Sequence, residues 1–228
     1  LGYTTEEILN FFFDTDTFEI STKGVKNTID EETGEIEFGD ITFHLIPERL
    51  RGQTAAFEIK NKRTVIVGRD RRITARHIKA IEKAGLTSLT IPADYLIGKV
   101  IAKDIIDEET GEIEYSANHE ITEESLEGIL SHPGQKIETI YTNDLDNGSF
   151  IADTLREDST TNQLEAQVEI YRMMRPGEPP TKDAAENLFK NLFFNPDRYD
   201  LSAVGRMKFN RRVGTKDIAG DGVLSNQD

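Results

Sequence analysis

The residues best suited to chemistry in this chain are arginines and lysines in its C-terminal third. Arg172 and Arg175 are three residues apart, so one face of a helix would carry both, directly before Pro176. Guanidinium groups bind phosphate oxygens through paired hydrogen bonds, and such contacts position a nucleic acid duplex without reading its sequence. The candidate residues for a phosphate-binding surface are Arg172, Arg175, Arg198, Arg206, Lys208 and Arg211.

A purely structural explanation competes with this interpretation. Basic side chains in the last turn of a helix interact favourably with the helix dipole, by about 0.3–1 kcal/mol each. Six or more basic residues surround two predicted helix ends and a turn here. Because that number exceeds what the dipoles require, we favour the phosphate-binding surface.

No group of residues indicates a catalytic or metal site. The four histidines are scattered and none has a second histidine four residues away: His44, His77, His119 and His132. The chain has no cysteine, which excludes disulfides and thiolate zinc sites, and it lacks a glycine-rich phosphate loop. Residues 143–148 resemble a calcium loop only loosely, because Leu145 occupies a ligand position. We expect no catalytic residue, no metal and no cofactor in this chain.

Charge is distributed unevenly along the 228 residues. The formal net charge is −15, from 42 acidic and 27 basic side chains. Residues 49–83 nevertheless contain 11 basic and 3 acidic side chains, and residues 167–213 contain 9 and 6. Each basic stretch is either a docking surface or a solvated face balanced by acidic neighbours in space. For residues 49–83 the two alternatives are equally supported.

The predicted elements divide the chain into two parts. Residues 15–147 mix strands with helices, and only helices are expected from about residue 160. Strands are expected at residues 64–67, 89–91 and 98–102. Threonine or aspartate caps are expected to begin the helices, namely Thr4 with Glu7 in a capping box, Thr74, Thr122, Thr181 and Asp200. This pattern predicts an α+β fold with a boundary near residues 147–150.

One nine-residue segment occurs twice. Ile29–Glu37 and Ile106–Glu114 both read IDEETGEIE. Each copy has acidic residues before a glycine and an isoleucine on either side, which predicts a β-hairpin with a bulge or a three-residue loop. The ligand spacing of a calcium loop is absent, so we expect hairpin tips and no metal.

Four stretches carry a family resemblance. The sequences RMMRPGEPPT at Arg172–Thr181 and YDLSAVGRMKFNR at Tyr199–Arg211 resemble the β subunit of bacterial RNA polymerase. PERLRG at Pro47–Gly52 and RRITARHI at Arg71–Ile78 are similar to the same subunit in proteobacteria. The resemblance covers essentially the whole chain, which would be a minor part of that subunit.

The resemblance implies a lobe on the downstream side of the DNA cleft, interrupted by a lineage-specific insertion. Residues 1–14 and 148–228 would form the mostly helical lobe, and residues 15–147 the inserted α+β module. The candidate residues would then face the downstream duplex and the non-template strand. The magnesium site of this nucleotidyltransferase lies in the β′ subunit, so the fragment is expected to be inactive alone.

The resemblance also implies partners and a cellular location. The expected partners are DNA and the polymerase subunits β′, α, ω and σ, in the cytoplasm. No apolar run is long enough to span a membrane, and no signal peptide is visible. The alternative function is a protein-interaction module, in which the insertion docks transcription factors or an acidic partner through residues 49–83. A metal-dependent hydrolase would need clustered carboxylates and histidines that we could not find.

Overall fold

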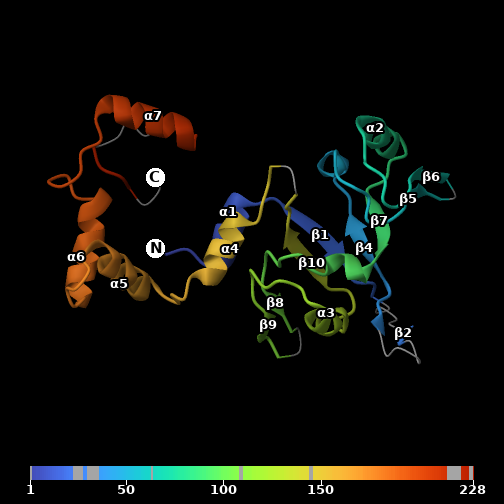
Figure 1. Cartoon of the computed structure of the whole chain (residues 1–228), viewed down its shortest axis with the longest axis horizontal. Coiled ribbons are helices and arrows are strands. Elements are labelled where there is room, and N and C mark those ends of the chain that lie inside the picture. Colours follow the sequence, from blue (N-terminus) through green and yellow to red (C-terminus); the bar gives the residue numbers. More distant parts are fainter. Residues whose placement is uncertain are drawn as a thin grey trace. The chain divides into compact units, whose positions relative to one another are not determined.

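The computed structural model describes residues 2–22, 28–29, 36–62, 64–107, 110–143, 146–214, 222–225 and 228. They belong to two compact units. The α+β unit runs from Tyr3 to Asp158, and the helical unit comprises Ser159–Asp228 and Gly2. Both units are shown in Figure 1. The α+β class predicted from the sequence is confirmed.

A four-stranded antiparallel sheet forms the centre of the α+β unit. Its strand order is β10 (Lys136–Ile140), β1 (Thr15–Glu19), β4 (Asp40–His44), β7 (Ser88–Pro92). Side chains alternate between buried and more exposed along the strands, as in Ile41 and Phe43 of β4 and Leu89 and Ile91 of β7. The sheet thus has one face that packs against a core.

Three small hairpins accompany the sheet. They are β2 (Thr28–Ile29) with β3 (Ile36–Glu37), β5 (Ile59–Asn61) with β6 (Thr64–Val67), and β8 (Ile105–Ile106) with β9 (Ile113–Tyr115).

The repeated segment forms a hairpin in both places, as predicted. Ile29 pairs with Ile36, and Ile106 pairs with Ile113, which is the same register in both copies. The register shifts between Ile105 and Ile106, and Gly111 has a φ of 72°, a value that favours glycine. The register shift is consistent with the predicted bulge, whereas the six residues between Ile106 and Ile113 exceed the alternative of a three-residue loop. The tip at residues 30–35 and residues 108–109 lie outside the described residues.

Helices and short 3₁₀ helices surround the sheet. They are α1 (Thr5–Phe12), η1 (Pro47–Leu50), α2 (Ala75–Lys83), η2 (Ala93–Leu96), α3 (Glu123–Leu130) and α4 (Phe150–Glu157). The predicted capping box is confirmed, because the Glu7 N–H donates to Thr4 Oγ1 at 3.2 Å and the Thr4 N–H to Glu7 Oε2 at 2.7 Å. Thr74 and Thr122 also cap α2 and α3 as predicted.

Two features of this unit differ from the prediction. Residues 98–102 do not form a strand, and instead make isolated bridges from Val100 to Glu120 and from Ile101 to Thr139. Helix α4 was not predicted, because its pattern is short and lies at the expected boundary.

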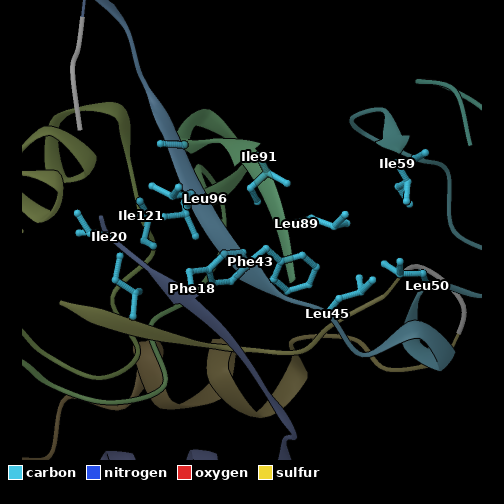
Figure 2. Close-up of a cluster of buried hydrophobic side chains, with 14 of the residues drawn as sticks. Phe18, Ile20, Phe43, Leu45, Leu50, Ile59, Leu89, Ile91, Leu96 and Ile121 are labelled. Carbon is cyan, nitrogen blue, oxygen red and sulfur yellow. The ribbon is translucent and has the colours of Figure 1, made fainter. Parts of the chain in front are cut away.

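The main core lies on the face of the sheet, where Figure 2 shows Phe18, Phe43 and Ile91. Buried side chains of α2 and α3 belong to the same cluster. Phe18 and Phe43 stack with their ring centroids 4.8 Å apart, between Ile20 and Leu45. Complete burial of such a side chain contributes about 1.5–3 kcal/mol to stability.

A second buried cluster joins α1 and α4 to the sheet. It contains Leu9 of α1, Ala152 of α4, Ile140 of β10 and Val100. Helices α1 and α4 pack against each other and lie side by side in Figure 1. Both helices therefore belong to the compact α+β unit. The proposal that residues 15–147 are inserted between residues 1–14 and 148–228 is a separate matter, and it stays a prediction.

The helical unit contains α5 (Gln163–Met174), α6 (Lys182–Phe193) and α7 (Ala203–Val213), of which α5 and α6 pack against each other. Helix α5 ends before Pro176, and Thr181 caps α6, as predicted. The prediction that Asp200 caps the last helix is wrong, because Ser202 Oγ accepts the Gly205 N–H at 3.2 Å. Among the described residues, no helix is both long and apolar enough to cross a membrane.

Candidate nucleic-acid interface

The two arginines at the end of α5 are exposed but already have acidic partners. Arg175 Nη1 lies 3.2 Å from Glu178 Oε2, and Arg172 pairs with Glu169 one turn earlier. More than half of each arginine side chain is accessible. Since exposed ion pairs of this kind are weak, a phosphate oxygen could replace either carboxylate as the partner.

The turn after α5 is held together by Glu178. Its Oε2 accepts a hydrogen bond from Tyr171 Oη at 2.8 Å and one from Arg175 Nη1 at 3.2 Å. The hydrogen bond from Tyr171, followed by that from Arg175, lowers the pKa of Glu178, and the same contact with Glu178 raises the pKa of Arg175. Both groups are therefore charged near neutral pH, and Arg175 is held at the surface beside the rigid Pro176 turn.

Three further candidates are exposed without such partners. Arg198, Lys208 and Arg211 have exposed side chains and form no ion pair with a described residue. Lys208 and Arg211 lie three residues apart on α7, and Arg212 lies four residues after Lys208, so one face of α7 carries all three. Gly214 ends the helix in the left-handed region, with a φ of 77°.

Arg206 has a different environment from the other candidates. Only 6% of the residue is exposed. Its Nη1 donates to Asp228 Oδ1 at 2.8 Å, and its Nη2 donates to the carbonyl oxygen of Val223. Lys208 follows it by two positions, which is roughly 200° around the helix. Arg206 thus connects α7 to the C-terminal residues, and we do not include it in the proposed contact surface.

Sequence patterns could not separate these roles. Arg206, Lys208 and Arg211 occur in one basic run, and the acidic partner of Arg206 lies 22 residues later. Arg212 belongs with Lys208 and Arg211 on the exposed face, although it was not among the six candidates. Helix periodicity alone could have found it, because it follows Lys208 by four residues.

Three of the four histidines have local polar contacts, and His119 lies beside the ring of Tyr115. His44 and His132 lie beside single glutamates, at 3.2 Å from Glu19 and 2.6 Å from Glu114. His77 Nδ1 accepts the Thr74 N–H at the start of α2, at 3.3 Å. Within the described ranges, no three histidine, aspartate or glutamate side chains are grouped so that they could hold a metal ion.

The structure thus defines an α+β protein whose helical unit presents basic side chains at the ends of two helices. Residues 136–221 match the family model described as RNA polymerase Rpb2, domain 2. This part of the chain is therefore similar to a domain of the second-largest subunit of an RNA polymerase. It runs from β10 to beyond α7, so it includes all six candidate residues.

Proposed function

We propose that this chain is a non-catalytic part of the β subunit of a bacterial DNA-directed RNA polymerase, of the proteobacterial type. Its helical part would line the downstream DNA cleft and contact the downstream duplex and the non-template strand. The observation that carries the proposal is the match of residues 136–221 to domain 2 of the second-largest subunit. Nucleotidyl transfer, with its magnesium ion, would belong to the assembled enzyme with its β′, α, ω and σ subunits.

The α+β part would be a module inserted into this lobe. An inserted module needs its two ends close together, so that the host fold can close around it. Thr15 pairs with Ile140 across β1 and β10, which brings the start and end of residues 15–147 close together. This pairing supports the insertion.

The proposed DNA contacts are non-specific contacts to phosphates. Arg172, Arg175, Arg198, Lys208 and Arg211 are exposed, and guanidinium and ammonium groups on helix ends suit phosphate oxygens. Because the whole chain carries a net charge of −15, the affinity of the isolated fragment should be low and strongly dependent on salt.

The test is fluorescence anisotropy of a labelled duplex with a single-stranded overhang, titrated with the 228-residue chain at several salt concentrations. A plot of the logarithm of the binding constant against the logarithm of the salt concentration gives a slope that reports the number of neutralised phosphates. The double variant Lys208→Gln/Arg211→Gln should make this slope shallower by about 0.9 for each phosphate that it no longer neutralises. The matched control, Lys182→Gln/Lys190→Gln, removes the same charge from α6. Equal effects of the two variants would contradict a specific binding face on α7.

A protein-interaction module remains the second candidate function. The specific observation is the β8–β9 hairpin, where Ile106 and Ile113 pair directly across the strands and are both about half exposed. Exposed apolar pairs of this kind occur at docking surfaces. If the module docks a transcription factor, Ile106→Thr/Ile113→Thr should abolish capture of that factor and leave DNA binding unchanged.

A further inference from the structure

The basic stretch at residues 49–83 folds as one substructure of the α+β unit. Helix α2, labelled together with β6 in Figure 1, packs against η1 and β6. Backbone hydrogen bonds join the segment after η1 to the segment before α2, including the Gly52 N–H to the Ile73 carbonyl at 2.9 Å and the Ala55 N–H to the Arg71 carbonyl at 3.0 Å. Six of its apolar side chains are buried in the main core, namely Leu50, Ile59, Val67, Ile73, Ile78 and Ile81, whereas Val65 is exposed.

The charged side chains of this substructure lie on its outside. We call the following eight exposed residues the α2 basic surface: Arg51, Lys62, Arg69, Arg71, Arg72, Arg76, Lys79 and Lys83. None of the eight forms an ion pair with a residue that the structure describes. In this respect they differ from Arg172 and Arg175, and from Arg49, which is half-buried and lies 2.9 Å from Asp16 Oδ1.

Helix α2 arranges three of these cations in a row. Arg76, Lys79 and Lys83 are spaced by three and four residues, so they share one helix face over about 10 Å of axis. Ile78 and Ile81, on the opposite face, are buried. The row therefore faces solvent along the whole helix.

The loops next to α2 extend this row at its N-terminal end. Arg72 forms a β-bridge with Thr54, directly before the Thr74 cap of α2. Arg51 precedes Gly52, whose N–H is bonded to Ile73. The arginines of both loops thus lie near the start of the helix. Within the described part of residues 47–83, three exposed carboxylates form no ion pair with another described residue, namely Glu48, Asp70 and Glu82.

We propose that the α2 basic surface binds the phosphate backbone of a nucleic acid duplex, as a second contact separate from α7. Five of its eight residues are arginines, whose planar forks fit phosphate oxygens. The centre of a protein–protein interface is usually depleted of charge and contains aromatic or apolar anchors. The exposed residues of α2 are instead arginine, lysine, alanine and glutamate, so a phosphate backbone fits this surface better than a protein does.

The net negative charge of the chain does not prevent this contact. Salt screens exposed charges beyond about 10 Å at 0.1 M ionic strength, so a bound phosphate responds to the cations beside it. Acidic residues elsewhere in the chain would mainly slow the approach of the duplex.

The experiment measures binding of a fluorescein-labelled blunt DNA duplex to the 228-residue chain by anisotropy, from low to moderate salt. The triple variant Arg76→Gln/Lys79→Gln/Lys83→Gln should weaken binding at least about tenfold at low salt and should flatten the salt dependence. The matched control removes three exposed lysines elsewhere, as Lys136→Gln/Lys182→Gln/Lys190→Gln, with the same change in net charge. It should weaken binding by less than about twofold.

A second variant tests whether any loss of binding by the triple variant comes from misfolding of α2. Arg71→Gln/Arg72→Gln leaves the helix unchanged and should also weaken binding, with an unaltered circular dichroism spectrum. Equal effects of the triple variant and its control would overturn the proposal, and so would no binding of the duplex at low salt. Tighter binding of polyglutamate than of the duplex would assign the surface to an acidic protein instead. Loss of binding on changing α7 but not α2 would leave the proposed function standing and remove only this second contact.

Discussion

At the scale of single residues, the burial of Arg206 determines which side chains the last helix can present. The guanidinium binds Asp228, whose side chain is fully buried, and the carbonyl group of Val223. Leu224 and Leu201 continue the connection through backbone hydrogen bonds to Phe193 and Gly222. One arginine thereby links α7 to Val223 and Asp228 and leaves the opposite face of α7 to Lys208, Arg211 and Arg212.

Replacing Arg206 by methionine should release this C-terminal segment. Breaking a buried ion pair leaves an uncompensated charge and costs about 3 kcal/mol or more. In Arg206→Met, the backbone amides of Leu201 and Leu224 should therefore exchange their hydrogens more than about a hundredfold faster, as measured by hydrogen–deuterium exchange. Lys208→Met is the matched control, because it changes an exposed residue of the same helix, and it should leave these amides protected.

The ion pair between Arg206 and Asp228 also makes the stability of this segment depend on pH. Burial raises the pKa of Asp228, but hydrogen bonds from Ser225 and Arg206 outweigh it and leave the pKa below its ordinary value of 3.8. An acid whose pKa is lower in the folded state than in the unfolded state stabilises the fold. This contribution is complete at pH values above the ordinary pKa, and it is lost as the pH falls through the pKa of the folded state. Protection of Leu224 in the unmodified chain should therefore be lost only in that acidic range. Protection that is already lost at neutral pH would contradict the pair.

At the scale of elements, the contact of α3 with the β8–β9 hairpin reverses the usual effect of a helix glycine. Replacing a glycine in a helix interior by alanine normally stabilises a protein by about 0.5–1 kcal/mol. A Cβ atom on Gly128 would overlap with Tyr115 Oη and would lie 3.3 Å from Tyr115 Cζ. The tyrosine would have to leave its position beside His119.

Gly128→Ala should therefore lower the free energy of unfolding, by about 1 kcal/mol. Removing the hydroxyl group with Tyr115→Phe relieves the overlap, so Gly128→Ala should become neutral or stabilising in that background. Urea denaturation of the four proteins of this cycle measures the effect. A stabilising Gly128→Ala in the unmodified chain would mean that β9 does not pack on α3.

Local elements could be predicted from the sequence, and long-range pairing could not. The capping residues Thr4, Thr74 and Thr122 act within three residues of themselves, which is why the predicted helix starts are confirmed. Strand β1 pairs instead with residues 136–140, and no pattern near Thr15 indicates that partner. Residues 98–102 have the apolar pattern of a strand because Val100, Ile101 and Ala102 are buried. Their backbone nevertheless makes only isolated bridges and no continuous pairing with another strand. In the candidate interface, helix spacing predicted the basic groups, but only the position of Asp228 shows that Arg206 is buried.

At the scale of the whole molecule, the extent of the α+β unit determines which fragments should fold. Tyr3–Asp158 contains all four strands of the central sheet and both buried clusters. Removing α1 and α4 would expose Val100 and Ile140, because Leu9 and Ala152 complete the second cluster. The module and the two flanking helices thus share a core.

A fragment of residues 3–158 should unfold in one cooperative transition, whereas residues 15–147 should be less stable by several kcal/mol, because they lack Leu9 and Ala152. Large truncations in a core typically cost about 2–5 kcal/mol each. Urea denaturation of both fragments, followed by circular dichroism, measures the difference. Equal stability of the two fragments would show that the shorter module is self-sufficient and that α1 and α4 add nothing to it.

The pairing of β1 with β10 also affects how the chain folds on the ribosome. Strand β4 is synthesised soon after β1, but more than a hundred residues separate the end of β1 from the start of β10. At roughly 5–20 residues per second, their translation takes on the order of 10 s. Throughout that interval, one edge of β1 has unpaired backbone groups, and such edges pair readily with other strands. The nascent chain is therefore most exposed to mispairing with its neighbours on the same messenger before residue 136 emerges.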